Sequence, residues 1–220
     1  MDDLKLKFVE YINWPTLPSD LHDDILSTIV TEQDIHPVVA NVVPTYNSTM
    51  SCGFRSYDAS QKVTQWVYDT IPIVSHFNKN AQPIRLHVLE NDELYPYYHR
   101  DKRPWAINYL VQTGGPNVTT EFFDHPVYKQ NIDNSTIQLH IPEAETIHSE
   151  VIDVHRWHML PYISKYPHAA LNIEKNNLRV MISLGLYWYM DFKTKNTNAF
   201  EIPSTQEVYQ KILESLAESA

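Results

Sequence analysis

Glycine and cysteine are scarce in this sequence of 220 residues, which has four glycines and the single cysteine Cys52. With so few glycines it contains neither a GxGxxG nor a GxxxxGK(S/T) motif, so a glycine-rich phosphate-binding loop is excluded as the basis of its function. One cysteine cannot form an internal disulfide bond, which favours a reducing compartment. The N-terminal segment MDDLKLKFVEYINW has early charges and no apolar signal-peptide region, so we expect a cytoplasmic protein.

Long apolar runs and an excess of basic residues are also missing. No run approaches the roughly 18 apolar residues that a membrane-spanning helix requires, so we expect no membrane partner. The 17 Lys and Arg residues against 27 Asp and Glu residues give a formal net charge of −10. This charge argues against a protein that holds nucleic acid through its phosphates, and it favours a basic partner such as a protein tail over nucleic acid. The oligomeric state is not indicated.

We interpret the chain as a single domain, residues 1–220, because no linker or internal repeat interrupts it. Residues 1–83 are predicted to be a mixed and partly helical support. Residues 84–190 are predicted to be the β core, and residues 191–220 to contain a closing helix.

Three segments have helical patterns. Residues 21–30 follow Ser19 and Asp20, either of which can cap a helix. Residues 58–71 place apolar side chains at helical spacing. The sequence STQE at 204–207 is a capping box, which predicts the C-terminal helix.

From residue 84 onward the pattern changes to short strands separated by turn signals. The expected strands are 84–90, 105–112, 118–124, 136–141, 147–154, 157–163 and 178–190. Such spacing is typical of a sandwich or barrel rather than of βαβ units, so we predict a mainly β fold of about eight strands with flanking helices.

The segment YPYYHRD contains His99 and Asp101, two residues apart. On an extended strand both side chains point to the same face, where they can supply two ligands of a 2-His-1-carboxylate metal site. The spacing alone is equally compatible with surface or turn residues at the end of a strand. An aromatic cluster nearby can line a substrate groove or pack in the core: Tyr95, Tyr97, Tyr98 and Trp105.

A third ligand has to come from elsewhere, and the candidates are His125, His140, His148, His155, His158 and His168. We favour His168 because Arg179 follows it within a strand pattern. The period of two places Arg179 and Ser183 on one face, where a buried arginine needs an anion or an acidic residue of the chain as its partner. His155 and His158 have HxxH spacing, but residues three apart in a strand face opposite sides, so this pair is a less favoured metal site.

Together these features resemble the Fe(II)/2-oxoglutarate-dependent oxygenases, in particular their prolyl-hydroxylase-like branch, over residues 84–190. His99-x-Asp101, the run WAINYLVQ, the TGG turn and PNVTTEFF resemble, in order, the HxD strand, the YLN-type strand and the GG-x-T-x-F segment of that branch. His168 and Arg179 match its distal histidine and its co-substrate arginine.

The resemblance implies a double-stranded β-helix core of the jelly-roll or cupin-like type. It also implies a dioxygenase that uses Fe(II), 2-oxoglutarate and O₂ to hydroxylate a C–H bond, with succinate and CO₂ as co-products. The substrate, a peptide side chain or a small molecule, is not identified by the sequence.

For the site, the resemblance implies three metal ligands, His99, Asp101 and His168. It implies that Arg179 binds the distal carboxylate of 2-oxoglutarate. Tyr109 and Ser183 match positions whose hydroxyl groups often share that carboxylate, and either can equally be a packed or internally bonded polar group. Asn108 is given no role.

Two other interpretations stay open. The chain can be a non-catalytic β-barrel binding protein that retains the oxygenase fold, although its complete set of ligand-type residues speaks against this. It can also be a cupin-type metalloenzyme with more histidine ligands, but the glycine-punctuated HxH motif of that class is absent.

Overall fold

The computed structural model describes residues 7–35, 54–71, 74, 84–90, 99–101, 105–124, 128–131, 136–140 and 145–184. Within these ranges the chain forms two α-helices and twelve β-strands. The helices are α1 (Ser19–Ile35) and α2 (Gln61–Thr70).

The strands form two six-stranded sheets, here named sheet A and sheet B, in which all neighbouring strands are antiparallel. Sheet A has the order β1 (Glu10–Ile12), β10 (Trp157–Leu160), β5 (Ala106–Thr113), β12 (Leu178–Leu184), β3 (Arg85–Glu90) and β2 (Phe54–Asp58). Sheet B has the order β7 (Tyr128–Asn131), β8 (Thr136–His140), β4 (His99–Asp101), β11 (His168–Leu171), β6 (Thr119–Phe123) and β9 (Thr146–Glu150).

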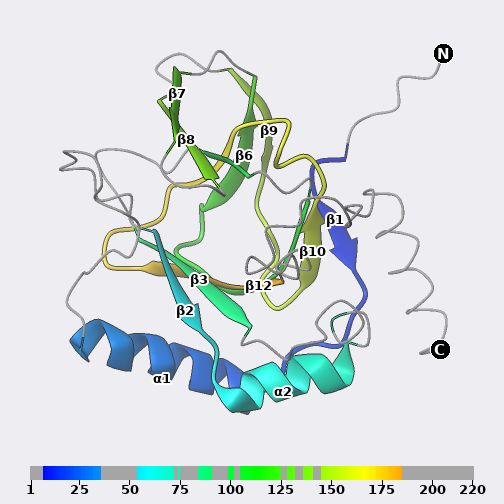
Figure 1. The fold of residues 1–220 in the computed structure, drawn as a ribbon, viewed down its shortest axis with the longest axis vertical. Helices are drawn as coiled ribbons and strands as arrows, with labels where there is room; N and C mark the ends of the chain where they lie inside the picture. The colour runs from blue at the N-terminus through cyan, green and yellow to red at the C-terminus, as the bar shows by residue number, and fades with distance from the viewer. Residues whose placement is uncertain are drawn as a thin grey trace, which may run out of the picture.

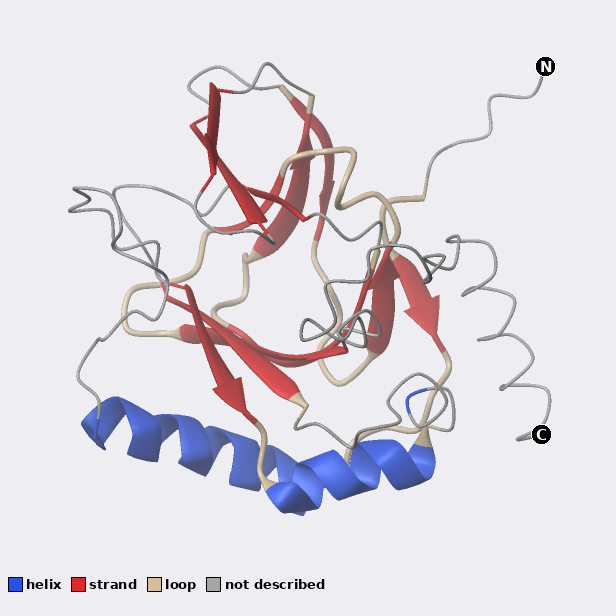
Figure 2. Cartoon of the chain, in the orientation of Figure 1, coloured by secondary structure: helices blue, strands red, loops and turns tan. Residues whose placement is uncertain are grey.

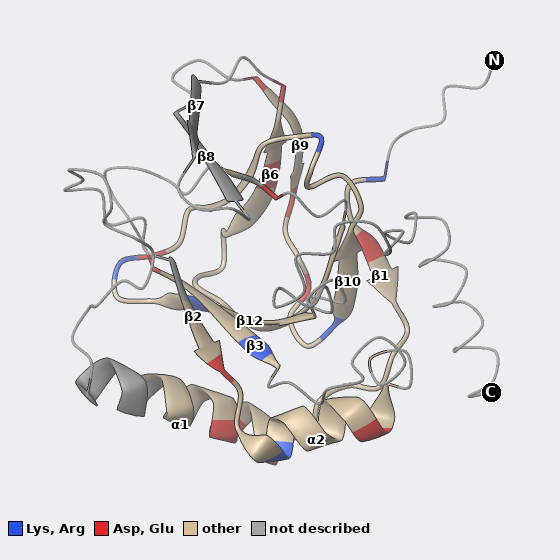
Figure 3. Cartoon of the chain, in the orientation of Figure 1, with Lys and Arg blue, Asp and Glu red and all other residues tan. Residues whose placement is uncertain are grey.

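The two sheets face each other, and both helices lie against the outer side of sheet A (Figure 1). Figure 2 shows the same arrangement as layers, with the helices on the side of sheet A that faces away from sheet B. This mainly β sandwich of jelly-roll type with flanking helices confirms the predicted fold class. Charged residues of both signs are scattered around the fold rather than gathered on one element (Figure 3).

The helices cover sheet A because each has an apolar stripe. Leu21, Ile25 and Ile29 recur every four residues in α1, and all three are buried. Val63 and Val67 form the corresponding stripe of α2. Burial of each such side chain stabilises the fold by roughly 1.5–3 kcal/mol.

Strand β5 of sheet A is buried on both faces over Ala106–Val111. Ile107 and Tyr109 pack in the cluster shared with the helices. Ala106 and Leu110, on the alternate positions, pack in a second cluster with Phe122 of sheet B. The even-numbered side chains of β5 therefore point between the two sheets. Only these residues of β5 can reach a site that lies there.

Several predicted boundaries need correction. The helix expected at 58–71 begins at Gln61, because Asp58 is the last residue of β2 and Ser60 is the N-cap that accepts a hydrogen bond from Val63 N. Helix α1 begins at Ser19, since the amide of His22 donates to the carbonyl of Pro18.

More strands form than the eight expected, because short strands were not recognised. Strands β1 and β2 come from the part predicted as a helical support, and they form the two edges of sheet A. The strand predicted at 147–154 is observed as Thr146–Glu150. The closing helix at 204–207 and beyond, residues 191–220 as a whole, and Tyr95, Tyr97 and Tyr98 lie outside the described residues.

Within the described ranges no helix is both long enough and apolar enough to cross a membrane.

We expect Gly114→Ala to lower the free energy of unfolding by about 1–3 kcal/mol, because Gly114 has φ +88° and an added Cβ would lie 3.1 Å from the amide nitrogen of Arg179. Urea unfolding measures the change. Asn117→Ala, an exposed change in the same turn, is the control and should stay within about 0.5 kcal/mol of the wild type. Equal stabilities for the two variants would contradict the prediction.

Candidate metal centre

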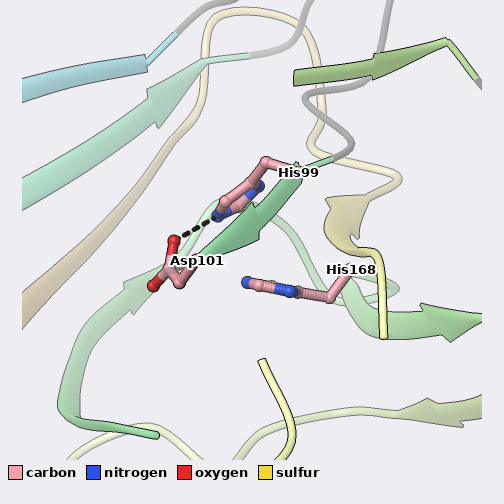
Figure 4. A group of neighbouring side chains, drawn as sticks. All are labelled: His99, Asp101 and His168. Atoms are coloured by element: carbon pink, nitrogen blue, oxygen red, sulfur yellow. Dashed lines mark ion pairs between the residues drawn. The ribbon is translucent and has the colours of Figure 1, made fainter. Parts of the chain in front are cut away.

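Strands β4 and β11 are neighbours in sheet B, and their pairing places His99 beside His168. Asp101 follows His99 by two residues in β4, so both side chains leave the same face of the strand. One ligand-type atom from each of these three residues lies within 4.8 Å of the other two. The close-up shows the three side chains pointing into one shared space (Figure 4). Among the described residues, this is the single group of three such side chains.

Two polar contacts orient the ligand atoms of this group. His99 Nε2 lies 3.6 Å from Asp101 Oδ1, and these side chains are 18% and 11% exposed. His168 Nδ1 lies 3.4 Å from the carbonyl oxygen of Tyr166, to which it donates when Nδ1 carries the proton. In that tautomer Nε2 bears the lone pair, and this is the form in which a histidine with an anchored second nitrogen binds a metal.

Contacts with neighbouring segments hold His168 and Asp101 in place. The ring of Phe122 stacks on that of His168, with centroids 5.7 Å apart and planes at 30°. Phe122 is fully buried and lies opposite His168 in the pairing of β6 with β11. The amide of Asp101 donates to the carbonyl of Ile163 at 3.0 Å. The three ligand-type side chains therefore stand on a backbone that is bonded on several sides.

Arg179 of sheet A reaches across to sheet B near this group. Its Nη2 atom donates to the hydroxyl of Thr120 at 2.8 Å, and Thr120 pairs with Ala170, two residues from His168. Its Nε and Nη1 atoms have no hydrogen-bond partner among the described residues. Burial lowers the pKa of Arg179 to about 10, so the guanidinium is still charged at neutral pH. A buried charge without a counter-ion is unfavourable, so this space suits an anion.

Three buried polar side chains form a row across sheet A on the same inner face. Asn108 pairs with Ser183 of β12 on one side and with His158 of β10 on the other. Asn108 Oδ1 and Ser183 Oγ have no hydrogen-bond partner among the described residues. Burial and, after it, the charge of Arg179 lower the pKa of His158 to about 3, so this imidazole is neutral at pH 7. The interior therefore holds unsatisfied donors and acceptors beside one positive charge.

Tyr109 lies on the opposite face of β5, away from this interior. Its hydroxyl is 3.0 Å from His22 Nε2 of α1 and accepts from the amide of Leu17 at 3.2 Å. Burial raises the pKa of Tyr109. The structure therefore does not bring Tyr109 to Arg179, and the inner position next to it belongs to Asn108.

The other candidate histidines are not gathered at the group. His155 is exposed, has a left-handed backbone with φ 59°, and packs against His22. His158 is buried, so the two members of the HxxH pair face different surroundings. His148 lies on β9, stacked on Phe8 with ring centroids 4.9 Å apart. His125 and the side chain of His140 lie outside the described residues, and Trp105 is buried in the core shared with the helices.

Sequence reasoning missed Asn108 and Thr120 and left the role of His158 open. A signal for Asn108 was present, because it is the one polar residue in the run WAINYLV. A polar side chain within a fully apolar strand is expected to be buried and to have a specific partner. Nothing in the local pattern of Thr120 distinguishes it from its neighbours.

Comparisons with known proteins add little to this picture. No family model matches the chain, and no curated protein matches it. One solved structure that it resembles is a prolyl-4-hydroxylase from Pseudomonas putida, with 12% sequence identity and a TM-score of 0.46. The match covers 83% of this chain and 94% of that one. At this level of similarity it says nothing about the reaction or the substrate of this chain.

We expect His168→Ala to weaken the binding of Fe(II) or Mn(II) by about 100-fold or more, because it removes one of three converging ligands. Anaerobic calorimetric titration of the metal measures the dissociation constant. His148→Ala is the matched control, since His148 stands two strands away in the same sheet and outside the group. Comparable losses of affinity in both variants would show that the site lies elsewhere.

Stability should fall at acid pH through His158. Its folded pKa of about 3 lies below the ordinary value of 6.5, so the unfolded chain takes up the proton first. The stabilisation is present above pH 6.5 and declines as the pH drops, by about 2 kcal/mol between pH 7 and pH 5. Urea unfolding at pH 7 and at pH 5 measures the change in the free energy of unfolding. In His158→Leu the fall between these pH values should be smaller by about 2 kcal/mol. An unchanged loss in the variant would contradict a neutral buried imidazole.

Proposed function

We propose that this chain is an Fe(II)- and 2-oxoglutarate-dependent dioxygenase that hydroxylates a C–H bond of a peptide side chain or a small molecule, with succinate and CO₂ as co-products. The observation that carries the proposal is the convergence of two imidazoles and a carboxylate near a buried arginine whose Nε and Nη1 atoms lack a partner among the described residues. The predicted single domain, cytoplasmic location and small-molecule or peptide substrate are parts of this proposal.

The donor set fits the metal. Two imidazole nitrogens and one carboxylate oxygen on one side of an ion are the ligands typical of non-haem Fe(II) oxygenases, and they leave the other positions open. His99, Asp101 and His168 would hold the ion. Iron and 2-oxoglutarate, with O₂ as the oxidant, would supply the oxidising chemistry that no side chain of the chain can provide.

The arginine fits the co-substrate. A carboxylate would accept a hydrogen bond from Nε or from Nη1 of Arg179, which otherwise lack partners in the described structure, and it would neutralise the buried charge. Thr120 holds the guanidinium by accepting from Nη2, and the hydroxyl of Ser183 is available to donate. Tyr109 has no part in the proposal because its hydroxyl lies on the helix side of sheet A.

In this proposal, apolar side chains between the sheets keep water away from the site. Leu110, Phe122 and Leu160 are buried together between the sheets. Such a wall excludes water from the interior, which strengthens the interaction of Arg179 with an anion and protects the site from side reactions. Asp101 supplies a carboxylate beside two imidazoles, so the set suits a divalent cation.

We expect the protein, loaded anaerobically with Fe(II), to develop a weak visible charge-transfer band when 2-oxoglutarate is added, and to release succinate slowly in air without a further substrate. Arg179→Met should weaken 2-oxoglutarate binding by about 10- to 100-fold, because charge-assisted hydrogen bonds are lost. Asp101→Ala should abolish the band.

Arg85→Met is the matched control, because Arg85 is a half-exposed arginine paired with Asp58 on β2. It should bind 2-oxoglutarate as the wild type does. Well-folded, metal-loaded protein that shows neither the band nor succinate would contradict the proposal and would favour a binding protein that retains the fold.

A further inference from the structure

We infer that His158 determines the specificity of the anion site proposed at Arg179, which takes a carboxylate together with one O–H donor placed between that carboxylate and the His158 imidazole. The inference rests on the proposed function, because it describes the part of the same interior that receives the distal end of the co-substrate. It assigns His158 and Asn108 roles that neither the sequence nor the comparisons give them.

The tautomer of His158 follows from its surroundings. Its Nδ1 atom lies 3.4 Å from the carbonyl oxygen of Arg156, so Nδ1 carries the proton and donates it there. With an exposure of 2%, the imidazole stays neutral, and Nε2 keeps its lone pair. The hydrogen bond to Arg156 uses Nδ1, so the Nε2 atom of His158 offers the interior a hydrogen-bond acceptor.

Asn108 extends this acceptor surface. It lies beside His158 in the pairing of β5 with β10, and facing side chains at such positions are about 4.5–5.5 Å apart at their Cβ atoms. Its Oδ1 atom also lacks a partner in the described residues. Two acceptors thus stand side by side on sheet A, and the charge of Arg179 is close enough to lower the pKa of His158.

A carboxylate alone does not satisfy this interior. It accepts hydrogen bonds from Arg179 but has no hydrogen to give to His158 Nε2, whereas the hydroxyl of Ser183, which pairs with Asn108, is a donor available to Asn108 Oδ1. An acceptor left without a donor in a buried site is unfavourable, and an apolar side chain at 158 would have avoided it. An O–H group resolves the mismatch, since it donates to His158 Nε2 while its oxygen or the adjoining carboxylate remains bound to Arg179.

The O–H group has two possible sources. An ordered water can donate one hydrogen to His158 and the other to the carboxylate, in which case 2-oxoglutarate fits as it is. Alternatively, the ligand carries a hydroxyl next to its distal carboxylate, as 4-hydroxy-2-oxoglutarate does. Both sources place the same donor at the same point, and they differ in which acid binds more tightly.

The test compares the dissociation constants of 2-oxoglutarate and 4-hydroxy-2-oxoglutarate by anaerobic calorimetry on Mn(II)-loaded protein, which requires no turnover. His158→Leu should weaken the better ligand by about 10-fold, because the acceptor is removed while the volume is nearly kept. His158→Gln, whose side-chain oxygen is again an acceptor, should recover most of this loss. His148→Leu is the control and should bind as the wild type does.

Each result is decisive. If the wild type prefers the hydroxy acid and His158→Leu loses that preference, the ligand supplies the donor. If the wild type binds both acids alike and both weaken in His158→Leu, a water supplies it. Unchanged or tighter binding of both acids in a folded His158→Leu, or no recovery in His158→Gln, overturns the inference and leaves the proposed function standing. A wild type that binds neither acid overturns both.

Discussion

The buried charge of Arg179 is the constraint on which the interior of this protein depends. A single neutral hydroxyl, that of Thr120, binds the guanidinium in the described structure, and its contribution is small beside the free energy that desolvation of a cation requires. Burial, and after it the charge of Arg179, keeps His158 neutral, and β5, β10 and β12 hold the polar row beside the guanidinium. Binding of an anion would remove most of the remaining penalty.

Much of the site follows from the sequence, because local geometry decides it. The spacing of His99 and Asp101 determines that both side chains share one face once β4 is extended. The choice of His168 among six histidines came from its position relative to Arg179, and the pairing of β11 with β4 brings it to His99. Whether these residues bind iron stays a prediction, since their convergence is compatible with other divalent cations.

For a strand that is buried on both sides, the sequence pattern does not show which side chains point toward the helices and which point between the sheets. In WAINYLVQ nearly every residue is apolar or aromatic, so alternation gives no sign of which side meets the helices. Tyr109 and Asn108 are adjacent in the strand, so their side chains point to opposite faces of sheet A, and an error of one residue in the assignment exchanges the two. Strands β1 and β2 were missed for another reason, since edge strands of three and five residues have too short a pattern and form through pairing with distant segments.

The residues of the candidate site are divided between the two sheets, so the separation of the sheets limits the length of a molecule that would contact both groups. His99, Asp101 and His168 stand on sheet B, whereas Arg179 and the polar row stand on sheet A. Facing sheets pack about 10 Å apart, a separation set by the side chains that interdigitate between them. The length of a molecule that would contact both sheets therefore depends on packing elsewhere, at residues such as Leu110 and Leu160. A change in their volume would alter which chain length fits, without touching any group that binds the molecule.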